Sequence, residues 1–153
     1  MLPVHSHAFT ARSFILVPVM AAACAAAAQE LVPYRVEQDA IPAALAQQPG
    51  DPVRGKSITT SRDSNCILCH ELPDTGERFM GNLGPPLSGV GARLTEGQLR
   101  LRIADSLRLN PDTIMPSYYR VEGLTGVAAR YRGKPVLTAE QIEDVVAYLK
   151  TLR

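Results

Sequence analysis

The stretch NCILCHE, Asn65 to Glu71, places two cysteines three positions apart and a histidine directly after the second cysteine. Such a trio can serve three kinds of chemistry: a redox dithiol, one half of a zinc site, or covalent attachment of a haem whose iron is bound by the histidine. Each alternative implies a different protein. The choice among them depends on which other ligands the mature chain can supply.

Residues 1–28 are predicted to be a secretory signal peptide that is removed from the mature chain. A short segment ending in Arg12 precedes a run of small apolar residues, Phe14 to Ala28, that ends in alanines. A membrane span would need about 20 strongly apolar residues, whereas this run is rich in alanine and contains Pro18. The alternatives are a retained anchor and lipid attachment at Cys24, although the alanines before Cys24 lack the large aliphatic residue usual at such sites. Export predicts a periplasmic protein with no membrane span after cleavage.

Cleavage would leave very few metal-binding side chains. The full chain has three cysteines, three histidines and four methionines, of which the mature part keeps Cys66, Cys69, His70 and two methionines. A structural zinc site uses four Cys or His ligands, and a thioredoxin-like dithiol needs a βαβ setting that no run of β-branched residues indicates. The spacing CxxCH therefore favours one covalent haem c, bonded by Cys66 and Cys69, with His70 on the iron.

The second axial ligand of that haem is predicted to be Met115. Met80 lies only ten residues after His70, so a short loop would have to reach from one face of the porphyrin to the other. Met115 lies in a loop between two prolines that restrict the backbone and can hold the sulfur inward. Without a haem, a methionine is more often a core residue. Weaker candidates are lysines such as Lys56 or Lys134.

The mature chain divides into an extended arm, residues 29–50, and a single domain of about 100 residues, 51–153. The arm is rich in proline, which disfavours regular structure and allows at most a short helical turn at 43–47. These prolines, with one at the domain boundary, are Pro33, Pro42, Pro49 and Pro52. Such an arm either lies along a partner or is mobile.

Two helix starts in the domain carry the same signal. In LTEGQL, Thr95 and Gln98 form a capping box, and in LTAEQI, Thr138 and Gln141 repeat it. The first helix is expected to reach about residue 107 and the last about residue 152. The apolar face of the last helix is expected to consist of Ile142, Val145, Val146, Leu149 and Leu152.

A further helix is expected to begin near Asp51 or Pro52 and to include Gly55 and Ile58. No segment has a convincing strand pattern, so the fold class is all-α. The chain has no Trp and only three Phe, and a covalent porphyrin would supply the missing apolar bulk.

The order of these motifs resembles a class I cytochrome c: CxxCH, then GPPLSG at 84–89, a late methionine, and a C-terminal helix with an aromatic residue. The resemblance implies that the Pro85 carbonyl orients His70 and that Arg93 lies near a haem propionate. It also implies that Gly55 lets the first helix approach the last beside Tyr148.

Within that class, residues 41–152 resemble the SoxX family, the small cytochrome of the SoxAX complex of bacterial thiosulfate oxidation. The run NPDTIMPSYY, 110–119, is the most specific part. The resemblance implies a monohaem subunit with His70 and Met115 as ligands, paired with a SoxA-type cytochrome. That complex, an L-cysteine S-thiosulfotransferase, couples thiosulfate oxidatively to a cysteine of the SoxYZ carrier and releases two electrons. This chain would be its non-catalytic electron acceptor.

Two other classes of haem protein are a freely diffusing electron shuttle and a haem enzyme. The mature chain lacks a spare thiol, a spare histidine and an evident acid/base pair, so electron transfer is expected rather than catalysis. A freely diffusing cytochrome c shuttle would use the same haem site but would not need the arm, and a haem enzyme would need a vacant or labile sixth position.

Residues 93–134 carry eight Lys or Arg against four Asp or Glu, which predicts either a docking face for an acidic partner or a solvated surface. No nucleic-acid motif is present.

Overall fold

The computed structural model describes residues 31–153, so the predicted signal peptide lies outside the described residues. Within this range the chain forms four α-helices and three short 3-10 helices and no strand, as the all-α prediction required. The α-helices are α1 (Pro52–Thr60), α2 (Val90–Arg93), α3 (Glu96–Ala104) and α4 (Ala139–Thr151). The 3-10 helices are η1 (Cys66–Leu68), η2 (Ser106–Arg108) and η3 (Ala129–Tyr131). None of the described helices is long and apolar enough to cross a membrane.

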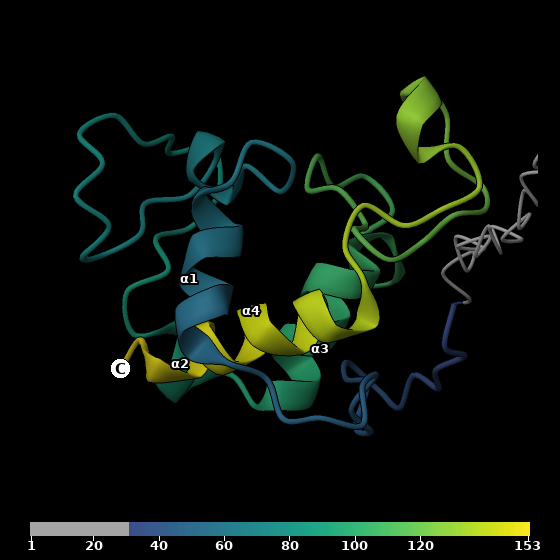
Figure 1. Ribbon diagram of the computed structural model, residues 1–153, viewed down its shortest axis with the longest axis horizontal. Coiled ribbons are helices and arrows are strands. Elements are labelled where there is room, and N and C mark those ends of the chain that lie inside the picture. The colour runs from purple at the N-terminus through teal and green to yellow at the C-terminus, as the bar shows by residue number, and fades with distance from the viewer. Residues whose placement is uncertain (1–30) are drawn as a thin grey trace, which may run out of the picture.

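Helix α1 lies across α4, and the two helices approach closely at a glycine (Figure 1). A Cβ atom built on Gly55 would lie 2.0 Å from the carbonyl oxygen of Asp144 and 2.8 Å from the Cβ of Tyr148. Only a residue without a side chain fits at that distance. The expectation that Gly55 lets the first helix meet the last beside Tyr148 is confirmed.

The two predicted capping boxes are present. The Thr95 hydroxyl accepts the amide of Gln98 while the Gln98 side chain accepts the Thr95 amide, and Thr138 and Gln141 make the same pair of bonds. These caps satisfy amide groups that would otherwise lack a partner at a helix start.

Helix α3 ends at Ala104, so the prediction that it reaches about residue 107 was wrong. Asp105 adopts φ −148° and ψ 70°, outside the helical region, and the chain then turns into η2. The Asp105 side chain is buried and accepts hydrogen bonds from Tyr34, Ser117 and Arg120. These partners come from other segments, and their bonds hold Asp105 away from the helical conformation.

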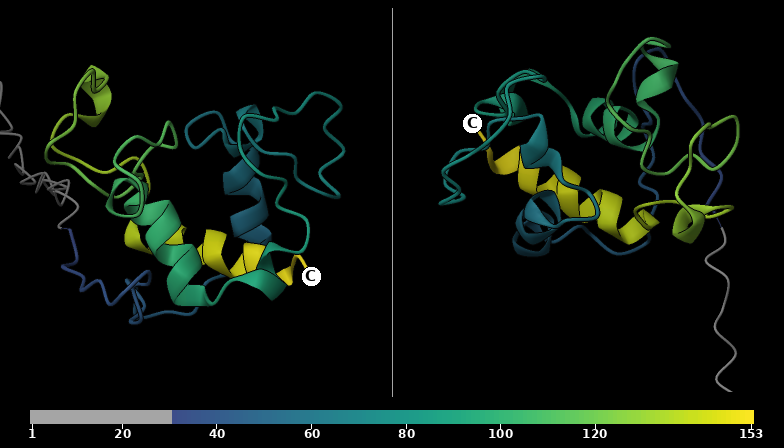
Figure 2. Two further views of the ribbon diagram at one scale, coloured as in Figure 1. Left: turned by 180° about the vertical axis from the view of Figure 1, so that it is seen from behind. Right: turned by 90° about the horizontal axis from the view of Figure 1, so that it is seen from above.

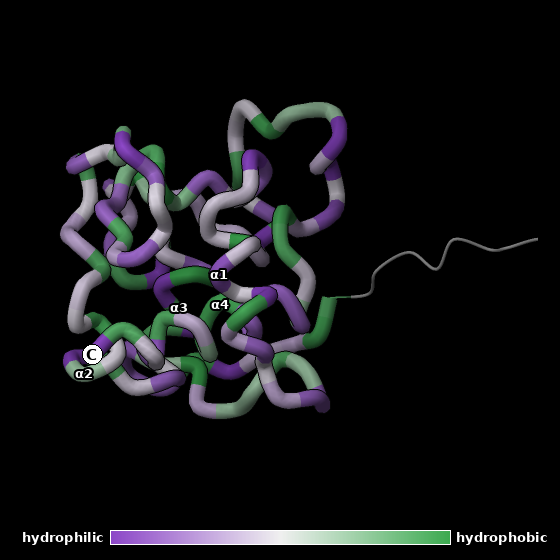
Figure 3. The backbone as a smooth tube through the Cα atoms, turned by 60° about the vertical axis from the view of Figure 1, so that its left-hand side comes forward, coloured by the Kyte–Doolittle hydropathy of each residue, from purple (hydrophilic) through white to green (hydrophobic). Residues whose placement is uncertain are grey.

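The core lies where α3 packs beside α4, with α1 across α4 (Figure 2), and Figure 3 shows apolar stretches meeting there. The apolar face of α4 is buried as predicted at four positions: Ile142, Val145, Val146 and Leu149 are each at most 5% exposed. The fifth predicted member, Leu152, follows the end of the helix and is half-buried. Burial of such side chains stabilises the fold by about 1.5–3 kcal/mol each.

The arm contains no helical turn in residues 31–50, and it packs along its own domain rather than projecting from it (Figure 1). Ile41 is fully buried and Leu45 is 4% exposed. The Ile41 amide donates to the Gly97 carbonyl oxygen at 2.9 Å, and directly after the arm the Asp51 amide donates to the Asp144 carboxylate at 2.7 Å. The arm is therefore an integral layer of the domain.

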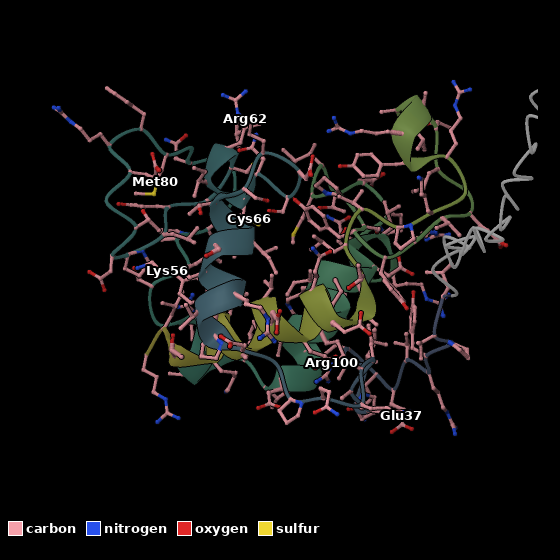
Figure 4. All side chains as sticks on the ribbon, in the orientation of Figure 1. Glu37, Lys56, Arg62, Cys66, Met80 and Arg100 are labelled. Carbon is pink, nitrogen blue, oxygen red and sulfur yellow. The ribbon has the colours of Figure 1, made fainter. Side chains whose placement is uncertain are left out.

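A buried ion pair between α3 and α4 binds the arm to the domain. Arg100 and Glu143 form a bidentate pair, with Nε to Oε1 at 2.7 Å and Nη2 to Oε2 at 2.8 Å, and both side chains are under 10% exposed. Arg100 also donates to the Ile41 carbonyl oxygen at 2.7 Å, and Glu143 accepts the Leu45 amide at 2.8 Å. Arg100 lies at the base of the molecule in Figure 4. Helices α3 and α4 and the arm thus share one polar cluster.

Candidate haem site

A cavity of about 380 Å³ opens between the helices, and it is lined mainly by apolar side chains. All four α-helices contribute to its wall: Thr59 from α1, Val90 and Arg93 from α2, Leu99, Arg102 and Ile103 from α3, and Val145 and Leu149 from α4. A second cavity of about 230 Å³ adjoins it. Cys66, His70, Pro85, Met115 and Tyr118 line both cavities, so the two form one cleft.

The two cysteines reach this cleft through the tight turn η1. Cys66 opens the turn and Cys69 ends it, with the Cys69 amide 3.2 Å from the Cys66 carbonyl oxygen. Asn65 stands before the turn in the left-handed conformation, φ 48°, which asparagine tolerates better than most residues. Sequence reasoning missed this role of Asn65, although its residue type was a signal. Both thiols are free.

Burial raises the pKa of the Cys66 thiol. A reactive dithiol needs a lowered thiol pKa so that a thiolate is present near neutral pH. The environment of Cys66 therefore opposes the redox-dithiol alternative. Among residues 31–153 no group of three His, Cys, Asp or Glu side chains is arranged to hold a metal ion.

His70 is held in one orientation by the loop that follows it. Its Nδ1 lies 2.7 Å from the carbonyl oxygen of Pro85, and a carbonyl can only accept, so Nδ1 carries the proton and donates. Nε2 is then the nitrogen that is left for a metal. A Cβ on Gly84 would lie 2.3 Å from the Cε1 atom of His70, so the glycine is what allows this loop to lie against the ring.

Met115 lines both parts of the cleft, whereas Met80 lines neither. The Met80 sulfur instead accepts the Leu72 amide at 3.2 Å inside the loop after η1, and Figure 4 shows it in that loop, apart from Cys66. Neither Lys56 nor Lys134 lines the cleft. Of the candidates for a second axial ligand, the structure brings only Met115 to the same cleft as His70.

Of the residues that the structure describes, Arg93 and Arg102 are the two arginines in the cleft wall, and no Asp or Glu lines it. Arg93 donates to the carbonyl oxygens of Ser88 and Pro86, at 2.7 and 3.3 Å. Arg102 pairs with Asp39 of the arm at 3.6 Å. Sequence analysis named Arg93 and missed Arg102, whose place depends on how α3 packs.

Tyr118 joins the two loops that carry His70 and Met115. Its hydroxyl donates to the Ser64 carbonyl oxygen at 2.6 Å, next to the cysteine turn, and its side chain is 6% exposed. Burial is the main cause that raises the pKa of Tyr118. The neutral hydroxyl is therefore the form that the fold stabilises.

The positive excess of residues 93–134 is largely bonded within the chain. Three of its arginines pair with carboxylates outside that segment, and Arg120 pairs with Asp105 inside it. The three outer pairs are Arg100 with Glu143, Arg102 with Asp39, and Arg130 with Asp63. This internal pairing leaves little of the segment's charge for steering a partner.

The donor set fits a c-type haem. Two free thiols three positions apart, one histidine oriented through Nδ1 and one methionine meet at a large apolar cleft in a chain that has no Trp. A porphyrin held there would fill the apolar volume that the side chains leave. The fold and the cleft together define a c-type cytochrome.

Comparisons with known proteins agree. Residues 53–153 match the family model described as "Cytochrome c". A solved structure titled "Crystal structure of SoxXA from P. pantotrophus" matches with 38% sequence identity, over 78% of this chain and 93% of that chain, with a TM-score of 0.72. The chain therefore belongs to the cytochrome c family, within which it is a SoxX-type cytochrome with covalently bound haem c. No curated protein matched.

Proposed function

We propose that this chain is the electron-accepting haem subunit of a periplasmic SoxAX-type complex, in which it pairs with a SoxA-type cytochrome. The observation that carries the proposal is the 38% identity to a solved SoxXA structure over 78% of the chain, together with the cleft at CxxCH. In such a complex the SoxA-type subunit couples thiosulfate oxidatively to a cysteine of a SoxYZ carrier. The two electrons released would then pass through this chain one at a time, because one haem accepts a single electron.

Four residues would hold the haem. Cys66 and Cys69 would bond it covalently, and His70 and Met115 would bind its iron. A bound haem supplies one-electron chemistry, and a His/Met ligand pair raises its potential relative to thiolate ligation. The Pro85 carbonyl fixes the ring of His70 through its Nδ1 proton, as outer partners of metal-bound histidines do. Arg93 would neutralise a haem carboxylate at the cleft wall.

The same residues argue that the chemistry of sulfur transfer lies elsewhere. Once Cys66 and Cys69 are bonded to the haem, the segment from residue 29 onward has no further cysteine and no second histidine. With His70 and Met115 both on the iron, a substrate would find no open position. This chain therefore accepts and passes on electrons, and it contributes no nucleophile.

The test is affinity purification of the tagged chain from its own host grown on thiosulfate, followed by a denaturing gel stained for covalent haem. We expect a haem-stained band for this chain and a second, larger haem-stained band for the SoxA-type partner. A variant with Cys66→Ser and Cys69→Ser, purified in parallel, should lose the first stain.

The other outcomes have defined meanings. A single stained band at the size of this chain would overturn the complex and support a freely diffusing shuttle. An exported chain without haem stain would overturn the haem assignment itself. Because the arm packs on its own domain, the presence of the arm does not favour the complex over the shuttle, and the gel decides between them.

A further inference from the structure

We propose that the N-terminal arm is a positioning element of the haem site: Tyr34, acting through the buried Asp105, holds the loop 115–119 where Met115 can bind the iron. The inference rests on the proposed ligation by Met115. It adds a role for Tyr34 and Asp105, which both lie outside the cleft wall. Tyr34 also precedes residues 53–153, the region that matches the cytochrome c model.

Asp105 is the meeting point of three segments. It is 5% exposed. Its Oδ2 accepts the Tyr34 hydroxyl at 3.1 Å, and its Oδ1 accepts the Ser117 hydroxyl and the Nη1 of Arg120, each at 3.2 Å. A buried carboxylate is stable only when such partners are present. The arm therefore supplies one of three bonds that keep this carboxylate in place.

Two serines fix the Met115 loop separately, because each donates its single proton away from the other. Ser117 donates its single hydroxyl proton to Asp105, and Ser106 donates its own to the Met115 carbonyl oxygen at 2.7 Å. The two serine oxygens lie 3.3 Å apart, and the Ser117 oxygen also faces the Leu107 amide at 3.4 Å. Both serines are 6% exposed, so no solvent bond replaces a lost partner cheaply.

A second contact from the arm reaches the same loop. The Val32 amide donates to the Tyr119 hydroxyl at 2.8 Å, and the Tyr34 and Tyr119 rings pack with their centroids 6.3 Å apart. Tyr119 is 3% exposed and directly follows Tyr118, which lines the cleft. The arm thus contacts the loop 115–119 in a second way, by a hydrogen bond to Tyr119 and by packing of two aromatic rings.

Within the loop, Met115 has little support of its own. Its amide bonds locally to the Thr113 hydroxyl at 3.1 Å, and its neighbours Ile114 and Pro116 are exposed. The bonds to η2 and Asp105 described above hold residues 115–117, while the Tyr118 and Tyr119 amides donate to the Ile103 and Ala104 carbonyl oxygens, each at 3.1 Å. Removing the Tyr34 hydroxyl leaves Asp105 short of one partner, and the loop then spends more time with Met115 away from the iron.

The test compares Tyr34→Phe with Tyr148→Phe in the haem-loaded protein. Tyr148 is also a buried tyrosine, but its hydroxyl has no hydrogen-bond partner among residues 31–153, so its removal costs no bond there. The probe is imidazole, which binds ferric iron only when Met115 is displaced. Each titration is read together with the far-red charge-transfer band of methionine-bound ferric haem and with the reduction potential.

We expect Tyr34→Phe to bind imidazole about tenfold more tightly than the unchanged protein, because a hydrogen bond to a charged group contributes about 1.5 kcal/mol and about 1.4 kcal/mol is tenfold. The far-red band should weaken and the potential should fall, while Tyr148→Phe should change neither. Ser117→Ala breaks the same connection on the loop side. The double variant should therefore add little to either single change.

Two failures can be told apart. If the unchanged protein has no methionine band, the proposed ligation by Met115 is wrong. In the second failure the methionine band is present, but Tyr34→Phe and Ser117→Ala have the same imidazole affinity and reduction potential as Tyr148→Phe. Met115 is then a ligand, and the arm does not position it.

Discussion

Replacing Glu143 with alanine should remove the ion pair that joins the arm to α3 and α4. Glu143 accepts three hydrogen bonds: from Arg100 Nε at 2.7 Å, from Arg100 Nη2 at 2.8 Å and from the Leu45 amide at 2.8 Å. After the change, Arg100 keeps only its bond to the Ile41 carbonyl oxygen. Its charge stays buried, because its side chain is 3% exposed.

The magnitude follows from these contacts. Breaking a buried ion pair by removing one partner costs about 3–5 kcal/mol, and a buried amide left unpaired, here that of Leu45, costs about 1–3 kcal/mol. The two losses share one site and do not simply add. We therefore expect a loss of about 4 kcal/mol in the free energy of unfolding, a large part of the 5–15 kcal/mol that is usual for a domain.

The assay is guanidinium unfolding of the haem-loaded protein, followed by circular dichroism of the helices. The matched control is Glu37→Ala, which removes the same side chain from an exposed pair with Arg35 at 3.7 Å and should cost at most about 1 kcal/mol. Replacing both Arg100 and Glu143 with leucine should recover much of the loss, because no charge is then left buried. The reasoning is refuted if Glu143→Ala is no more destabilising than Glu37→Ala.

Three further changes have defined outcomes. Gly55→Ala should lower the free energy of unfolding by about 1–3 kcal/mol, since its Cβ would lie 2.0 Å from the Asp144 carbonyl oxygen; an unchanged unfolding midpoint would contradict this. Met115→Ala should lower the reduction potential and admit carbon monoxide to the ferrous haem, and a variant that keeps its potential would exclude Met115 as ligand. Burial and then Asp105 raise the pKa of Tyr34 from 10.0 to about 12, so the protonated hydroxyl stabilises the fold in full below pH 10. This contribution is lost as pH rises toward about 12, and denaturant unfolding across that range should show a smaller fall in Tyr34→Phe.

Local signals in the sequence were reliable because their partners are close in the chain. The capping boxes at Thr95 and Thr138 bond residues three positions away, so both helix starts could be predicted. The histidine after two spaced cysteines likewise needs only a tight turn to place its side chains together, and η1 provides that turn. The apolar period of α4 was sufficient to predict its buried face.

Other features depended on residues that are far apart. The end of α3 at Ala104 follows from Asp105 meeting Tyr34, 71 residues earlier in the chain, and the arm is held through Leu45 and Glu143, 98 residues apart. Prolines in the arm predicted the absence of helix, but they could not predict which surface the arm would cover.

The sequence by itself determined the cofactor and the helix starts of this SoxX-type cytochrome, since motifs and caps act over a few residues. Tertiary structure alone decided that Arg102 joins Arg93 in the cleft wall, and that the arm belongs to the domain. The physical reason is that a cleft wall and a buried ion pair are completed by groups from several segments. Their meeting depends on how those segments pack, which no local pattern encodes.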